Sequence, residues 1–127
     1  IINVFDLQGN KIENTDIISK MKTDNENYFI TVDRNDTYRI VDKDENVIID
    51  NNYSYIEHIS GEYFIVAKDG KNGIIDLTGK SLVDLKYSSI YEIQGTNLLQ
   101  AEINNNKTVS LINSDMEIIK TMDNAIV

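Results

Sequence analysis

The chain contains no cysteine and only one histidine, His58. Without thiols, neither a disulfide framework nor a thiolate metal site can form, so reducing and oxidising compartments are equally compatible with the sequence. Nucleophilic catalysis requires an activated hydroxyl or thiol beside a base, and His58 is the only imidazole available for that role. It lies between apolar strand residues, where we expect a structural or solvent-facing side chain. The sequence therefore predicts that this chain is not an enzyme.

Basic residues are also scarce, since 12 Lys and Arg stand against 21 Asp and Glu, for a formal net charge of -9. A surface of this sign repels phosphate backbones and anionic lipids instead of releasing their counterions. No apolar run approaches the roughly 18 residues of a membrane span, and no basic segment followed by an apolar one marks a signal peptide. We therefore expect no nucleic-acid partner and no membrane insertion.

Glycine-rich segments are missing as well, because the six glycines are separated in the sequence, and we expect them at the repeat turns. No glycine run opens a helix, so a phosphate cradle is not expected. Carboxylates occur throughout so acidic a chain, and no pair stands out as a general acid and base. The sequence predicts no cofactor.

What the chain does contain is a repeat of about 35 residues. Its clearest element is a turn that opens with Asp or Asn, at residues 6–9, 42–45, 76–79 and 113–116. An Asp or Asn side chain at the first turn position accepts backbone N–H groups, and glycine at the fourth, as in Gly9 and Gly79, adopts a left-handed backbone. The pattern is typical of type I turns.

Two apolar strands recur in register with the turn. The first occupies residues 28–32, 63–67 and 98–102, and the second occupies residues 17–21, 55–59 and 89–93. β-Branched and aromatic residues fill these runs, while Gly, Asn and Asp fill the gaps between them, as strands and turns require. The pattern predicts an all-β fold built of antiparallel hairpin or meander repeats.

The length fits a single repeat domain over residues 1–127 that can bury a core. Its units are expected at about residues 1–27 (incomplete), 28–61, 62–95 and 96–127. A hairpin unit cannot bury its apolar face alone, so the units must pack as propeller-like blades or as a stacked-sheet array. Short loops between units, such as residues 60–62, favour blades in a small or incomplete ring.

The chain begins with Ile1, and its first unit is incomplete, so we expect a piece of a longer protein. The sequence leaves the cellular location open, with the cell envelope or secretion slightly favoured over the cytoplasm.

The third copy has the sequence KDGKNGIIDLTGK at residues 68–80 and LKYSSI at residues 85–90. It resembles the bacterial WG repeat, whose unit carries a Lys-Trp-Gly hairpin exit, an Ile-Asp-x-x-Gly-Lys turn and a Lys-Tyr-Asp-x-Ile segment. The family's tryptophan position is held here by Ile2, Tyr38, Asn72 and Val109, and its glycine position by Asn3, Arg39, Gly73 and Ser110. The resemblance implies a shared repeat fold and, because the family is regarded as non-enzymatic, a non-catalytic role.

A calcium loop is suggested by the alternation of Asp42, Asp44 and Asn46. The sixth position of such a loop should be glycine and is Val47, and the twelfth should be a bidentate glutamate and is Tyr53. The sequence therefore favours an acidic β-turn with no metal, and a calcium-dependent module is the weaker alternative.

Exposed aromatic rings could bind a carbohydrate or a peptide, since flat rings stack on sugars and anchor partners at low entropic cost. Most tyrosines recur in register and are explained by packing between repeats. Tyr38, Tyr55 and Tyr91 are the candidates for exposure and hence for binding. We expect a non-catalytic binding or scaffold module for a protein or carbohydrate ligand. The alternative is an accessory domain that positions substrate for a larger enzyme.

Overall fold

The computed structural model describes residues 8–10, 17–105 and 107–123, and this part of the chain forms strands, turns and no helix. Its twelve strands pair antiparallel in three four-stranded sheets. The predicted all-β repeat fold is thereby confirmed. None of the described segments is a helix that could cross a bilayer.

Each sheet is a meander in which the strands pair in chain order. The first sheet contains β1 (Ile17–Lys22), β2 (Tyr28–Asp33), β3 (Tyr38–Asp42) and β4 (Val47–Tyr53). The second contains β5 (Tyr55–Ser60), β6 (Tyr63–Lys68), β7 (Lys71–Asp76) and β8 (Ser81–Tyr87). The third contains β9 (Ser89–Glu92), β10 (Leu99–Ile103), β11 (Thr108–Ile112) and β12 (Ile118–Met122).

Single serines separate the sheets in sequence. Ser54 lies between β4 and β5, and Ser88 lies between β8 and β9. The amide of Ser54 donates to the carbonyl of Ala67 at 2.8 Å, and that of Ser88 donates to the carbonyl of Glu102 at 2.7 Å. The chain therefore passes from the last strand of one sheet directly into the ladder of the next. The sheet boundaries differ from the expected unit ends at residues 61 and 95, which fall inside the second and third sheets.

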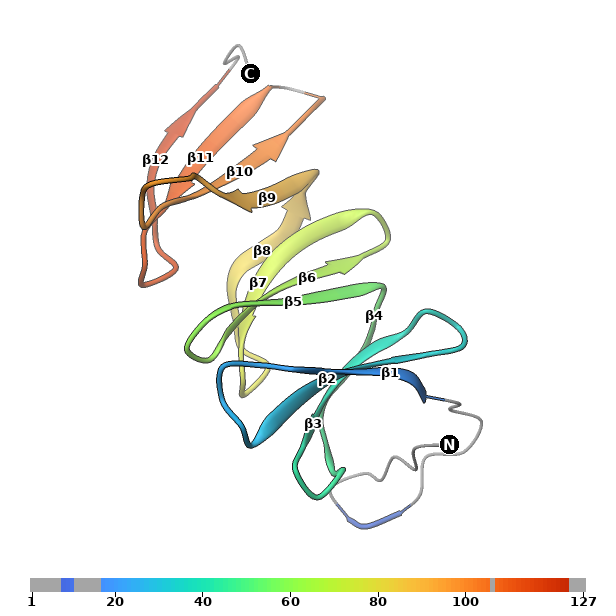
Figure 1. The fold of residues 1–127 in the computed structure, drawn as a ribbon. Coiled ribbons are helices and arrows are strands. Elements are labelled where there is room, and N and C mark those ends of the chain that lie inside the picture. Colours follow the sequence, from blue (N-terminus) through green and yellow to red (C-terminus); the bar gives the residue numbers. More distant parts are fainter. Residues whose placement is uncertain (1–7, 11–16, 106, 124–127) are drawn as a thin grey trace.

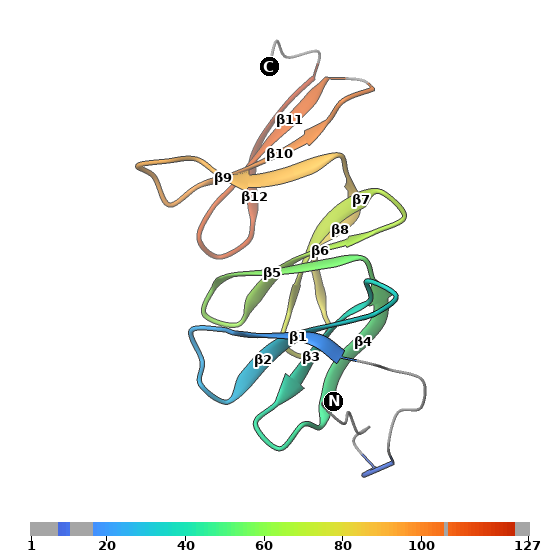
Figure 2. The same ribbon diagram turned by 45° about the vertical axis from the view of Figure 1, so that its right-hand side comes forward.

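The three sheets follow one another along the molecule, with the first and third at opposite ends (Figures 1 and 2). Of the two arrangements expected, the stacked-sheet array is the one observed, and the blade-like ring that short loops favoured is not. The reason is that residues 60–62 form the β5–β6 hairpin within one sheet. The length of that loop therefore says nothing about how one sheet packs on the next.

Two apolar clusters join the sheets. Ile40, Ile49 and Tyr53 of the first sheet pack against Phe64 and Val66 of the second. The second junction is built from equivalent positions: Ile74, Val83 and Tyr87 of the second sheet pack against Leu99 and Ala101 of the third. Because each sheet contributes one apolar face to each of its junctions, burial of these faces holds the sheets together.

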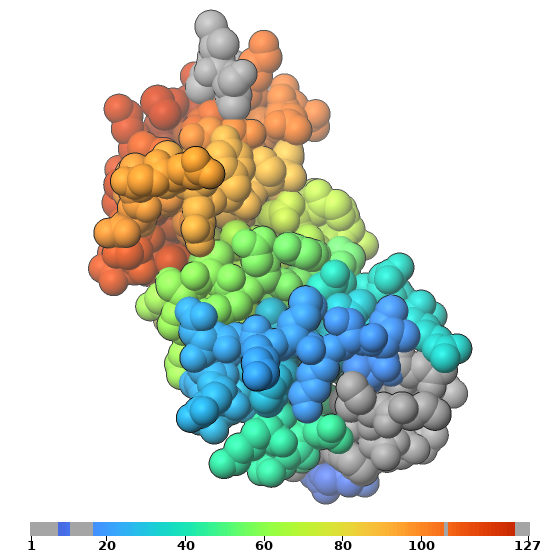
Figure 3. Space-filling view, in the orientation of Figure 1, coloured from blue at the N-terminus to red at the C-terminus, as the bar shows by residue number. Residues whose placement is uncertain are grey.

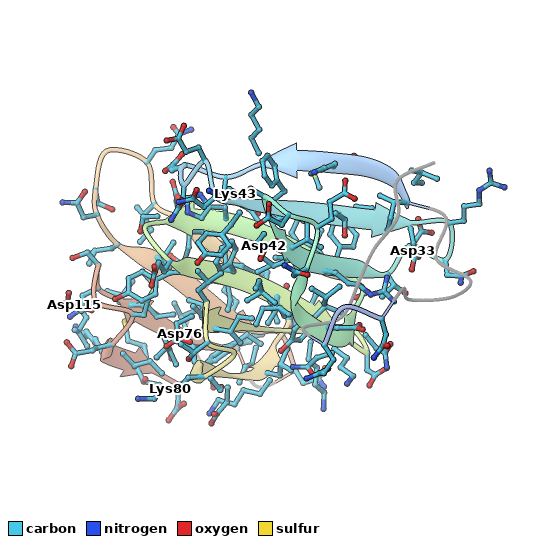
Figure 4. The ribbon with its side chains drawn as sticks, turned by 90° about the horizontal axis from the view of Figure 1, so that it is seen from below. Asp33, Asp42, Lys43, Asp76, Lys80 and Asp115 are labelled. Carbon is cyan, nitrogen blue, oxygen red and sulfur yellow. The ribbon has the colours of Figure 1, made fainter. Side chains whose placement is uncertain are left out.

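The Asp and Asn turns predicted from the sequence are present at Asp42, Asp76 and Asn113, and that at Asp6 lies outside the described residues. In each described turn the fourth residue donates its amide to the carbonyl of the first at 3.0 Å, as in a type I turn. The first residue's side chain accepts two further amides, for instance Thr78 at 2.9 Å and Lys80 at 3.1 Å on Asp76 Oδ1. The Thr78 hydroxyl also donates to Asp76, and these bonds hold the pKa of that carboxyl below its usual value. Figure 4 shows Asp42, Asp76 and Asp115 at turns on one side of the sheets, away from Asp33.

The fourth turn position is left-handed in every described copy, with φ of 67° at Glu45, 87° at Gly79 and 62° at Met116. We therefore expect Glu45→Gly to raise the free energy of unfolding by about 1 kcal/mol, because glycine takes this conformation without the strain of a Cβ. The change also removes an ion pair of 3.7 Å with Lys20, whose side chain is 26% exposed, and such pairs contribute little. Urea unfolding measures the change. Glu45→Gln, which removes the charge and keeps the strain, is the control, and an equal gain from both would assign the effect to charge.

Candidate functional site

The hairpins β1–β2, β5–β6 and β9–β10 lie on the same side of the stack, one above another (Figures 1 and 3). Between successive hairpins the surface is hollowed. The first groove, of about 510 Å³, is lined by residues 21–24 of the first sheet, residues 55–58 of the second, and by Ile30 and Tyr38. The stacking of two sheets thus creates a concave surface that neither sheet has alone.

Two of the tyrosines singled out in the sequence meet in this groove. The rings of Tyr38 on β3 and Tyr55 on β5 lie 5.4 Å apart between centroids and are tilted by 57°. Tyr38 is half-buried against the junction between the sheets, whereas 41% of Tyr55 is exposed. A tilted aromatic pair with one exposed ring offers an apolar surface at low entropic cost to a partner.

The hydroxyl of Tyr55 donates to Glu57 Oε1 at 3.0 Å, two residues along the same strand. Burial, the bond to Glu57 and the charges of Glu57 and Tyr38 raise the pKa of Tyr55 above its usual value. The phenol therefore stays protonated, and it orients the carboxylate at the rim of the groove. Residues two apart in a strand share a face, so Glu57 could have been found from the sequence once Tyr55 was chosen.

His58 connects the two sheets at one end of the groove. Its Nε2 lies 2.8 Å from the carbonyl of Gly61 and must carry the hydrogen, because a carbonyl only accepts. Its Nδ1 lies 3.8 Å from Asp24 Oδ2 in the β1–β2 loop, and its ring packs on Phe64 at 5.2 Å between centroids. His58 has a structural position in this arrangement. Asp24 was missed in the sequence, since only the stacking of sheets brings it near β5.

Tyr91, the third tyrosine predicted to bind, is not among the residues that line this groove. It lies on β9 in the third sheet, where its hydroxyl donates to Glu102 Oε1 at 2.6 Å. This bond, burial and the charge of Glu102 raise the pKa of Tyr91 above its usual value. With 42% of its surface exposed, Tyr91 matches Tyr55 in exposure and in its carboxylate partner but belongs to another part of the molecule.

A second groove, of about 390 Å³, lies between the second and third sheets. Glu92 of β9 lines it at the position that His58 holds in β5, and the β9–β10 loop contributes Thr96, Asn97 and Leu98. It has no aromatic ring among its lining residues. The first groove is therefore the better candidate for a binding site.

The residues that suggested a calcium loop form hydrogen bonds with one another inside their own turn. Asp42 Oδ1 accepts the amides of Asp44 and Asn46 at 2.9 Å each. The side-chain amide of Asn46 donates to Asp42 Oδ2 at 3.1 Å, so its nitrogen faces the carboxylate. Within the described parts of the chain, no group of three or more His, Cys, Asp or Glu side chains is arranged to hold a metal ion.

A family model described as the WG containing repeat matches the chain twice, over residues 38–71 and 73–106, together more than half of its length. Each match runs across a sheet boundary, so the sequence repeat combines half of one sheet with half of the next. No curated protein matches the chain at a significant level. The two consecutive matches fall on the same strands that build the junctions between sheets, and the chain belongs to the WG containing repeat family.

Proposed function

We propose that this chain is a non-catalytic binding module that holds its ligand in the first groove. The observation that carries the proposal is the meeting of Tyr38 and Tyr55, which come from different sheets and form one partly exposed aromatic surface. Concave sites lined by apolar and aromatic groups, with a few polar groups at fixed positions, are the usual form of a ligand site. Here Glu57, His58 and Asp24 supply those polar groups.

The chemistry of the groove supports binding rather than catalysis. His58 is its only imidazole, and the Nε2 of that ring is engaged by the carbonyl of Gly61. Glu57 is exposed, and it accepts the hydrogen bond of the Tyr55 hydroxyl. Catalytic acids and bases are usually desolvated within a cleft, and Glu57 lacks that burial. The accessory domain of a larger enzyme remains the second candidate, and it would use the same groove to position substrate.

The test is a selection of ligands with a groove variant as counter-selection. A random peptide library and a glycan array are each probed with the wild-type chain and with Tyr55→Ala. We expect ligands that bind the wild type and lose at least about tenfold in affinity with Tyr55→Ala, as truncation of an aromatic anchor typically causes. If every selected ligand bound the wild type and Tyr55→Ala equally, the binding site would lie outside the first groove. If no ligand were selected, a binding function would be contradicted.

A further inference from the structure

The first groove is lined by the edge strands of two sheets, as the described residues form them. The strand orders place β1 at the edge of the first sheet and β5 at the edge of the second, and both strands line the groove. An edge strand presents N–H and C=O groups that an extended peptide can pair with. A carbohydrate has no repeating backbone amide to complete such a ladder. The backbone geometry therefore favours an extended peptide over a glycan.

The charge around the groove selects among peptides. Asp24 and Glu57 line it, and the adjoining hollow between the hairpins β1–β2 and β5–β6 shares Asp24 and adds Glu26 and Glu62. Lys22 and, when protonated, His58 are the cations among the lining residues. Four carboxylates along one path outnumber these two groups, in a chain of net charge -9. Complementary charge steers a partner to its site and excludes partners of the wrong sign.

The floor of the groove is apolar where the rim is acidic. Among its lining residues Ile30 and Ile56 are buried and Tyr38 is half-buried, while Met21 and Tyr55, whose ring contacts that of Tyr38, are exposed. Apolar pockets of this kind receive the buried anchor of a peptide, while charges at the rim pair with its neighbours. The required sequence is an apolar residue flanked by lysine or arginine.

We propose that the first groove binds an extended cationic peptide segment. An apolar side chain of the segment packs against Tyr38 and Tyr55. Its flanking basic side chains pair with Glu57 and Asp24 and with the loop residues Glu26 and Glu62. This inference rests on the proposed function and names the class of partner. The segment runs along the edges of β1 and β5 and continues over the loop of residues 24–27.

The test uses a fluorescein-labelled probe, acetyl-Lys-Lys-Phe-Lys-Lys-amide, in fluorescence anisotropy with the whole chain. We expect saturable binding that weakens with added salt, because screening shortens charge interactions to about 10 Å at 0.1 M. Tyr55→Ala and Glu57→Gln should each weaken binding about tenfold. The matched control is Tyr91→Ala, since Tyr91 is equally exposed and also bonded to a glutamate. It should change affinity by less than about twofold, as expected for a residue outside the contact, and circular dichroism checks that each variant folds.

Three outcomes would overturn the inference. An equal loss with Tyr55→Ala and Tyr91→Ala would mean unspecific attraction to an acidic surface. If a probe with glutamate in place of each lysine bound as tightly as the cationic probe, charge would not select the ligand. Binding of an uncharged hexasaccharide, lost with Tyr55→Ala, together with no binding of the cationic probe, would replace the peptide by a carbohydrate. In that last case the groove remains the binding site, so failure of this inference is distinct from failure of the proposed function.

Discussion

Replacing Gly73 with alanine should lower the free energy of unfolding by about 1–3 kcal/mol, the range of substitutions that overpack a core. A Cβ at this position would lie 2.6 Å from the carbonyl oxygen of Val83, 2.9 Å from the amide nitrogen of Leu85 and 3.0 Å from the carbonyl carbon of Asp84. All three atoms are backbone, so no flexible side chain can move away. Chemical denaturation of the two proteins measures the loss.

The first sheet shows how this cost can be reduced. The position equivalent to Gly73 is Arg39 on β3, which has a Cβ. The neighbouring strand β4 contains Asn52 in a left-handed conformation with φ of 56°. Asn52 corresponds to Lys86 in the second sheet, whose φ is not positive. Asparagine takes this conformation more readily than lysine. We expect Lys86→Asn to recover part of the stability lost with Gly73→Ala, and no recovery would mean that the two sheets resolve the crowding differently.

Ser110 provides the control for size at the same repeat position. In the third sheet it pairs with Thr121 without a register shift, and no strand bulges over it. Its hydroxyl lies 3.1 Å from that of Thr121. Ser110→Ala should therefore cost no more than about 1 kcal/mol, the net contribution of one hydrogen bond. A loss as large as that of Gly73→Ala would mean that the Ser110 hydroxyl contributes more than one ordinary hydrogen bond.

Arg39→Met should lower the free energy of unfolding by about 3–5 kcal/mol, because it removes one partner of a buried ion pair. Arg39 Nη1 lies 2.7 Å from Asp33 Oδ2, and the two side chains are only 9% and 3% exposed. The other carboxylate oxygen of Asp33 accepts the amides of Asn35 and Thr37 at 2.8 and 3.0 Å. A methionine in place of Arg39 would leave this buried carboxylate without its cation. Urea unfolding of the two proteins measures the difference.

The double variant Asp33→Asn with Arg39→Met tests whether the charge is responsible. An asparagine keeps an oxygen for the turn amides and removes the buried charge, so the double variant should be more stable than Arg39→Met alone. Replacement of a buried pair by neutral groups is often close to neutral in stability. A double variant no more stable than Arg39→Met would mean that the effect comes from packing of the arginine stem or from its second ion pair, Nε to Asp50 Oδ1 at 3.1 Å, and not from the Asp33 charge.

The cost of Arg39→Met should also depend on pH. Burial raises the pKa of Asp33, but the hydrogen bond from Arg39, the amides of Thr37 and Asn35 and the charge of Arg39 outweigh it, so that the pKa lies below its usual value of 3.8. A carboxyl with a lowered pKa stabilises the fold at pH values above 3.8, and this contribution is lost as the pH falls through the folded-state pKa. The difference between wild type and Arg39→Met should shrink in that window. If the difference in free energy of unfolding stayed constant down to the acid transition, the cost of Arg39→Met would not come from the Asp33 charge.

The strands, the turns and the repeat could be predicted because their causes are local. A side-chain oxygen at Asp42, Asp76 or Asn113 finds its amide donors within four residues, so the sequence alone contains the interaction. The exposed tyrosines Tyr55 and Tyr91 were found in the same way, from alternation about the apolar positions Ile56 and Ile90.

The sheet boundaries were beyond the sequence, because a period of about 35 residues describes the same array whichever strand begins the unit. Ser54 and Ser88 end the sheets because their amides pair with the next ladder, and equivalent strands offer equivalent partners in sequence. The sequence also could not predict how one sheet stacks on the next, since apolar faces attract without a preferred direction.

The sequence by itself determined an acidic, all-β array of repeats with turns fixed by Asp and Asn. It also indicated which tyrosines are not explained by packing between repeats. Only the tertiary structure decided which of these tyrosines lie together. Stacking brings Tyr38 of one sheet to 5.4 Å from Tyr55 of the next and carries Asp24 to His58, while Tyr91 remains in the third sheet. The physical reason is that hydrogen bonds within turns and ladders have local partners, whereas the groove arises from burial between faces that sequence spacing does not orient relative to each other.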